Sequence, residues 1–257
     1  MIEALPEGLP SGHHFLRGST RLWCSDELPG NLPELWATLR DQRETTGVTP
    51  FLTWHEDVYR PWDPAEVEAV DLGAVLPERF ADYRRDLLRH QAAPEPEVPE
   101  GAEPWPYNPG PPFESWPGLA PSTSLDSNYP DPVDAAARTV AAIVRSDPHG
   151  LPDCRLVLVP AAWGANVPAH FGWFADAPLG LFCALLRSWH ERFGAEVVAA
   201  FGGEVHVAVP RPPMTQHHAY VVAVEHVLTQ ADNVGWSAFP EYSANLVRRI
   251  RWTFWWD

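Results

Sequence analysis

Ten prolines lie between positions 94 and 121, and their density constrains the fold of this chain more than any other feature of its sequence. Proline lacks an N–H donor and holds the preceding residue in extended geometry, so the stretch forms neither a helix nor a central strand. It predicts a semi-stiff, acidic linker over residues 94–125. Because Trp105 and Trp116 lie within this linker, we expect it to contact a folded surface.

The linker separates an N-terminal α/β region, residues 1–93, from a C-terminal α+β domain, residues 126–257. In the N-terminal region, β-branched and aromatic residues predict strands over residues 15–24 and 48–54. Apolar residues at helical spacing predict a helix that Asn31 caps and Gly47 ends, a short helix that begins at Asp63-Pro64, and a longer one over residues 77–90.

In the C-terminal domain, the order of predicted elements after a first helix is βαββαβ. Gly202-Gly203 joins two strands and is a strong hairpin signal. The predicted strands are residues 155–159, 196–201, 204–209 and 251–257, and the predicted helices are residues 132–144, 178–193, 215–228 and 241–249. This order is typical of a ferredoxin-like sandwich, and we predict that fold for the domain.

Strand periodicity assigns the side chains of this sheet to two faces. The first face is apolar and is expected to lie under the long helices; it holds Leu156, Leu158, Val197, Ala199, Phe201, Val205, Val207, Val209, Trp252, Phe254 and Trp256. The second face is mixed; it holds Arg155, Val157, Val159, Glu196, Val198, Ala200, Glu204, His206, Ala208, Arg251, Thr253 and Trp255. We expect the N-terminal region or a ligand to cover the second face.

Composition excludes several classes of function. All 18 basic residues are arginine, which excludes a Schiff-base lysine, a phosphate-binding P-loop lysine and the ATP-pairing lysine of kinases. A net charge of −16 argues against nucleic acid and anionic membranes as partners. No pattern predicts a cofactor. We predict a cytoplasmic bacterial protein from three features: the acidic start of the sequence, the absence of a long apolar stretch and the three scattered cysteines. The chain is also rich in tryptophan, with 13 residues.

Several stretches of the C-terminal part resemble one bacterial family, domain-of-unknown-function family 4253. They are Leu186-Arg187-Ser188-Trp189, Arg192-Phe193-Gly194-Ala195, Val209-Pro210-Arg211-Pro212-Pro213, Glu225-His226, Ala231-Asp232-Asn233-Val234, Glu241-Tyr242-Ser243 and Trp252-Thr253-Phe254-Trp255-Trp256-Asp257. The resemblance spans roughly residues 154–257. It implies a shared fold, and it implies no activity and no catalytic residue.

Few residue patterns indicate chemistry. His218 and Glu225 are seven residues apart and share one face of a predicted helix, which makes them weak candidates for a metal site. Glu204 and His206 are neighbours on one predicted strand, and a carboxylate beside an imidazole is the best acid/base candidate. The more common reading of both pairs is a solvated helix face or a salt-bridged sheet edge.

Two further segments are candidates for binding. Trp163, His170, Trp173 and Phe174 lie in a glycine-containing loop after the strand 155–159, and exposed aromatic loops are frequent recognition surfaces. The alternative is that Trp173 closes a helix end over the core. Asp232 and Asn233 follow a predicted helix, where they fit a helix cap or turn as well as a ligand site.

Two classes of function remain open from these observations. The first is a non-catalytic protein-binding or regulatory module, of which immunity-like proteins that neutralise basic toxins are one kind. The second is an enzyme or small-ligand binder, with a site between the two halves of the chain that uses Glu204 and His206. The absence of lysine and of any catalytic motif favours the first class.

Overall fold

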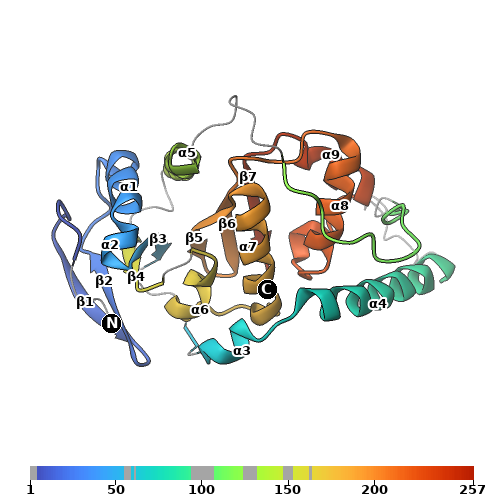
Figure 1. Cartoon of the computed structure of the whole chain (residues 1–257), viewed down its shortest axis with the longest axis horizontal. Coiled ribbons are helices and arrows are strands. Elements are labelled where there is room, and N and C mark those ends of the chain that lie inside the picture. The colour runs from blue at the N-terminus through green and yellow to red at the C-terminus, as the bar shows by residue number, and fades with distance from the viewer. Residues whose placement is uncertain are drawn as a thin grey trace, which may run out of the picture.

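The computed structural model of the chain describes residues 5–54, 59–60, 62–93, 107–123, 132–146, 153–161 and 164–257. Its centre is one seven-stranded sheet with the strand order β1-β2-β4-β3-β5-β6-β7 (Figure 1). The strands are β1 (Gly12–Arg17), β2 (Thr20–Ser25), β3 (Thr49–Trp54), β4 (Cys154–Val159), β5 (Glu196–Phe201), β6 (Glu204–Ala208) and β7 (Arg251–Trp255). The predicted mixed α+β class is confirmed.

The strands on either side of the proline-rich stretch belong to the same sheet. β4 comes from the C-terminal part of the chain and lies between β2 and β3, which come from the N-terminal part. It pairs antiparallel with both, and its register with β3 runs from Thr49 opposite Val159 to Trp54 opposite Cys154. The division of the sequence at the linker is therefore not a division of the sheet.

The sheet does not have the predicted ferredoxin-like arrangement. In a split βαβ unit the two strands joined by a helix run parallel, with one strand between them. Here β3 lies between β4 and β5, pairs antiparallel with β4 and pairs parallel with β5, so β4 and β5 run antiparallel. The order of elements in the C-terminal part does not reveal this arrangement, because the inserted strand lies more than 100 residues earlier in the chain.

Helices pack on both faces of the sheet. They are α1 (Leu32–Asp41), α2 (Arg43–Thr46), α3 (Pro64–Glu68), α4 (Leu72–Ala92), α5 (Pro132–Ser146), α6 (Val167–Phe171), α7 (Leu179–Phe193), α8 (Gln216–Val227) and α9 (Phe239–Leu246). α7 crosses in front of the strands in Figure 1, and its Phe182 and Trp189 pack against Phe254 of β7. On the opposite face, α1 and α5 share a second apolar core with β3, β4 and part of β5.

Two parts of the predicted face assignment are wrong. Leu156 and Leu158 of β4 face α1 and α5, whereas Val157 and Val159 belong to the core under α7. Helices cover both faces of β4, so its apolar residues alternate without a polar face to orient them. In β5, a bulge between Val197 and Ala199 shifts the alternation by one residue and moves Ala199 and Phe201 to the second face.

The described part of the linker, residues 107–123, has neither helix nor strand and packs along the helices. The ring of Trp116 lies 6.1 Å from that of Phe80 in α4, and Arg84 of the same helix donates a hydrogen bond to the Phe113 carbonyl at 2.8 Å. The predicted contact of Trp116 with a folded surface is confirmed, and Trp105 lies outside the described residues. Among the described helices, none has both the length and the apolar character that crossing a membrane requires.

Candidate functional site

The second face of the sheet is only partly covered by the described helices. α1 and α5 pack over β4, β3 and the start of β5, while the end of β5 and the strands β6 and β7 carry partly exposed side chains on this face. We call this set the open face; it consists of Phe201, Glu204, His206, Arg251, Thr253 and Trp255. The antiparallel register places Glu204 opposite Trp255 and His206 opposite Thr253.

Aromatic rings flank the carboxylate of Glu204 on both sides. Phe201 is its cross-strand neighbour on β5, and Trp255 is its neighbour on β7. The row extends outward, because the ring of Trp54 lies 5.7 Å from Phe201 and that of Trp236 lies 5.4 Å from Trp255. Trp236 is 57% exposed and Trp54 is 39% exposed. Four aromatic side chains from separate segments therefore form a row, and Glu204 lies between its two inner members, Phe201 and Trp255.

Sequence reasoning did not place three of these aromatic residues in a site. Phe201 was assigned to the opposite face, because the bulge in β5 has no clear sequence signal. Trp54 ends a strand of the N-terminal part and meets Phe201 only through the pairing of β3 with β5. Trp236 follows Gly235 in the segment between the predicted helices 215–228 and 241–249, and an isolated tryptophan between two helices was the one available signal.

The predicted pair of Glu204 and His206 lies in this row. His206 Nε2 is 3.4 Å from Glu204 Oε1, and His206 Nδ1 is 3.5 Å from the Thr253 hydroxyl. Burial, aided by the positive charge of Arg251, lowers the pKa of His206 to about 4, while burial raises the pKa of Glu204. At neutral pH the imidazole is therefore uncharged, and the charged groups of the open face are the half-exposed carboxylate of Glu204 and the guanidinium of Arg251.

The predicted aromatic loop does not form one exposed surface. Trp173 is 2% exposed, packs against Phe182 and Trp256, and donates a hydrogen bond from Nε1 to the Gly202 carbonyl at 2.8 Å. It is a core residue because Gly172 ends α6 in the left-handed conformation, with φ of 78°, and turns the chain inward. Two other members stay nearer the surface: Phe174 is exposed, and burial lowers the pKa of half-buried His170. Trp163 lies outside the described residues.

Asp232 and Asn233 are engaged with the end of the chain. The Asn233 side-chain amide donates to the Thr253 carbonyl and accepts from the Trp255 N–H, both at 2.9 Å. Asp232 accepts from the Asp257 N–H at 3.0 Å. β7 is an edge strand, and these contacts occupy backbone groups on its outer side. Both residues thus protect a sheet edge, a role that sequence reasoning missed because their partners lie 20 or more residues further along the chain.

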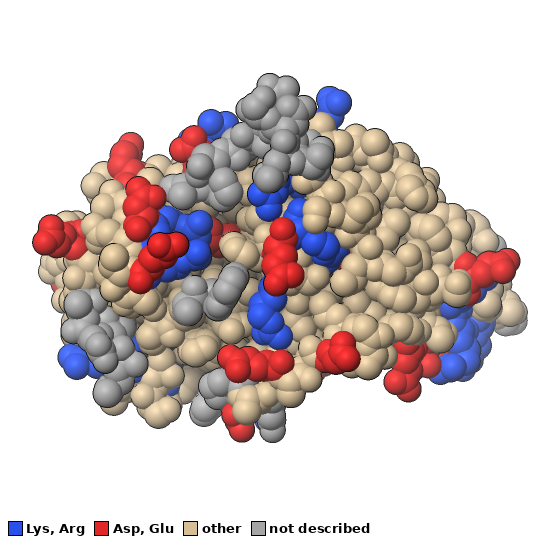
Figure 2. All heavy atoms as spheres, in the orientation of Figure 1, with Lys and Arg blue, Asp and Glu red and all other residues tan. Residues whose placement is uncertain are grey.

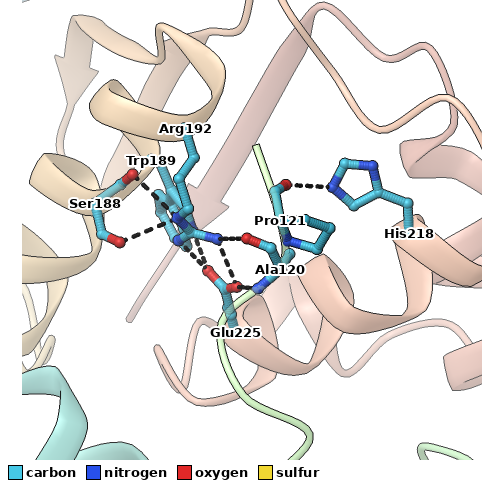
Figure 3. Close-up of polar contacts among 7 residues, drawn as sticks. All are labelled: Ala120, Pro121, Ser188, Trp189, Arg192, His218 and Glu225. Carbon is cyan, nitrogen blue, oxygen red and sulfur yellow. Dashed lines mark hydrogen bonds and ion pairs between the residues drawn. The ribbon is translucent and has the colours of Figure 1, made fainter. Parts of the chain in front are cut away.

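The weak metal candidates, His218 and Glu225, hold the linker segment instead (Figure 3). Glu225 is fully buried and accepts hydrogen bonds from the Trp189 indole, the Ala120 N–H and both terminal nitrogens of Arg192. The His218 ring contacts the Pro121 carbonyl at 2.8 Å. Across the described residues, no group of three His, Cys, Asp or Glu side chains is arranged to hold a metal ion.

The three cysteines lie in the core. Burial raises the pKa of Cys24 to about 11 and that of Cys183 to about 12, so both thiols stay protonated at neutral pH. Cys154 is also buried. A thiolate nucleophile needs an electropositive, partly exposed setting, which Cys24 and Cys183 do not have.

The fold and the open face define a mixed α+β protein with a half-covered sheet and an aromatic row around a carboxylate. Residues 155–257 match the model of a family described as a domain of unknown function (DUF4253), which confirms the resemblance of the C-terminal part. The matched segment contains β4 from its second residue, β5 to β7 and the network of Arg192 and Glu225, whereas β1 to β3 precede it. No curated protein and no solved structure matches the chain.

Proposed function

We propose that this protein is a non-catalytic binding module, and that its open face binds a basic segment of another protein. The observation that carries the proposal is the position of Glu204, which is half-exposed between Phe201 and Trp255. Aromatic faces attract cations through their quadrupoles, and a nearby carboxylate adds a charged hydrogen-bond acceptor. This combination favours the side chain of an arginine or a lysine.

The charge of the whole chain supports the same class of partner. The sequence has 34 acidic residues and 18 basic ones, so its field attracts basic proteins and repels acidic ones. Long-range attraction of this kind raises association rates, while the aromatic row supplies contacts that a uniformly acidic surface lacks. Regulatory proteins and immunity-like proteins that neutralise basic toxins are examples of modules with this behaviour.

The proximity of His206 and Glu204 favours a second candidate, an enzyme or small-ligand binder that uses this pair. The pKa of His206, lowered to about 4, makes the imidazole a weak base at neutral pH, where an efficient general base has a pKa near 7. Its Nδ1 contact is the hydroxyl of Thr253 rather than a carboxylate that would raise its basicity. Binding without catalysis is therefore the better-supported candidate.

Calorimetric titration with an octa-arginine peptide at physiological salt tests the proposal. We expect Trp255→Ala to weaken binding about fivefold and Glu204→Gln about threefold, with both effects greater in the double variant. Glu241→Gln removes one exposed charge from α9, away from the open face, and is the matched control.

If Glu204→Gln and Glu241→Gln lose affinity equally and Trp255→Ala loses none, the peptide binds through the net charge of the protein alone. That result would overturn the assignment of the open face. Thermal melting of each variant shows whether its fold is intact before the affinities are compared.

A further inference from the structure

Charged side chains gather around Glu196, the first residue of β5, and around Gly194 and Ala195, the turn that joins α7 to β5. Glu196 is 3% exposed and forms ion pairs with Arg40 of α1 and with Arg43 of α2, the latter at 3.4 Å. The N-terminal and C-terminal parts of the chain therefore meet at a buried carboxylate. Figure 2 shows charged side chains of both signs over α1, α2 and α7, on the molecular face seen in Figure 1.

Two further nitrogen-containing side chains, those of His190 and Arg211, lie beside the two residues of the turn. His190, in the last turn of α7, contacts the Ala195 carbonyl through Nδ1 at 3.0 Å. The Arg211 guanidinium packs against Gly194, where an added Cβ would lie 3.4 Å from its terminal nitrogen. Gly194 also has a φ of 66°, so both the backbone and the space at this position favour glycine.

Arg211 has a buried nitrogen that lacks a partner. Its Nε is shielded from solvent and makes no hydrogen bond with any residue that the structure describes. A buried, unpaired donor on a charged group is costly, because the group loses its water without a replacement acceptor. An acceptor supplied by a ligand would remove this cost.

The cluster carries an excess of positive charge. Arg40 and Arg43 share the buried carboxylate of Glu196, and Arg211 lies beside Gly194. The charges of all three arginines act on His190, and each helps to lower its pKa after the larger effect of burial. The negative charge of Glu44 also acts on Arg43 and raises its pKa, against the larger lowering effect of burial. Glu44 is an exposed residue of α2, so solvent screens its charge. The excess is unexpected in a chain with a net charge of −16.

We propose that the cluster of Arg40, Arg43 and Arg211, beside His190, is a binding site for a small oxyanion of the phosphate class, either free phosphate or a phosphomonoester. Arginine forks bind tetrahedral oxyanions through paired N–H donors, and several forks around one point favour a multivalent anion over a monovalent one. The site joins α1, α2 and the segment between β6 and α8, next to the turn between α7 and β5, and is separate from the open face. It does not depend on the function proposed above.

Calorimetric titration of the full chain with inorganic phosphate, at constant ionic strength maintained with chloride, tests this proposal. We expect saturable binding that Arg211→Gln weakens about tenfold, since one charge-assisted interaction is lost. Arg43→Gln is a second variant with a similar expected loss, and it guards against a folding defect specific to Arg211→Gln. Arg138→Gln removes an exposed arginine of α5 and should change the affinity less than twofold.

Parallel titrations with acetate and with phenyl phosphate identify the ligand class. Weak acetate binding is expected, and tighter binding of phenyl phosphate than of phosphate would mark a phosphomonoester as the ligand. The proposal is overturned if phosphate shows no saturable binding. It is equally overturned if Arg211→Gln and Arg43→Gln bind phosphate as tightly as Arg138→Gln does, because the ion then binds elsewhere.

Discussion

Arg192 and Glu225 form a two-pronged ion pair inside the protein, with hydrogen bonds of 2.9 and 2.7 Å. The Glu225 side chain is fully buried and that of Arg192 is 11% exposed. The same pair binds the backbone of Ala120, which donates to Glu225 at 2.7 Å and accepts from Arg192 at 2.8 Å. Through this arrangement α7 and α8 hold the linker segment against the helices.

Replacing Glu225 by alanine should destabilise the protein strongly. Arg192 would keep a largely buried charge without its partner, and loss of one member of a buried pair typically costs about 3–5 kcal/mol. Denaturant unfolding measures the change. Glu191→Ala, at an exposed position of α7, is the control and should cost under about 0.5 kcal/mol. Similar unfolding midpoints for the two variants would contradict a structural role of the pair.

The linker should also loosen when this pair is broken. Limited proteolysis of Glu225→Gln is expected to cleave residues 107–123 faster than in the wild-type protein, because Ala120 N–H loses its charged acceptor. Unchanged cleavage kinetics would mean that Trp116 and Phe113 alone hold the segment.

Trp173 and Phe174 are adjacent in sequence but should respond differently to substitution. Trp173→Ala removes a buried ring from between Phe182 and Trp256 and should cost about 3–5 kcal/mol. Phe174→Ala removes a side chain that is 44% exposed and should change the stability far less. Thermal melting compares the two variants. If Trp173→Ala is as stable as Phe174→Ala, Trp173 is not a core residue, and the loop is an exposed surface as the sequence predicted.

Asn233 should matter for solubility as well as for stability. Asn233→Ala leaves the Thr253 carbonyl and the Trp255 N–H unpaired on an edge strand, which exposes a template for strand pairing between molecules. We expect a loss of about 1–3 kcal/mol and a rise in aggregates by size-exclusion chromatography. Asn233→Asp keeps the acceptor for the Trp255 N–H and loses only the donor to the Thr253 carbonyl, so it should lose less stability than Asn233→Ala. Monomeric, fully stable Asn233→Ala would contradict the role of this side chain.

His226 should make the stability depend on pH below neutrality. It is fully buried, it contacts the Tyr242 hydroxyl at 2.8 Å, and burial lowers its pKa to about 3. The unfolded chain, with an ordinary histidine pKa near 6.5, binds more protons between these values, so the stability is fully present above about pH 6.5 and falls as the pH falls toward 3.

The contribution of His226 to this slope is up to about 1.4 kcal/mol per pH unit. Denaturant unfolding at several pH values, for the wild-type protein and for His226→Gln, isolates it from the slopes of His206 and His190, whose pKa values are also lowered. The substituted protein should have the shallower dependence. Equal slopes would mean that His226 does not titrate in the unfolding transition.

Local sequence signals determined most of the secondary structure. Gly194 ends α7 in the left-handed conformation, and Thr215 caps α8 by accepting from the His218 N–H at 3.2 Å, as their sequence positions indicate. The Gly202-Gly203 hairpin and the burial of Trp252, Phe254 and Trp256 also follow from short-range patterns. These features depend on residues a few positions apart, where turn geometry and side-chain periodicity act directly.

Only the tertiary structure decided how distant segments combine. The insertion of β4 between β2 and β3, the partners of Glu225 and the aromatic row around Glu204 all join residues far apart in the chain. Ala120 lies 105 positions before Glu225 and Arg192 lies 33 before it, and no local pattern encodes such a pairing. Strand pairing and burial select these contacts by the free energy of the whole fold. The sequence alone therefore does not distinguish Glu225, in a buried ion pair, from Glu204, half-exposed on the open face.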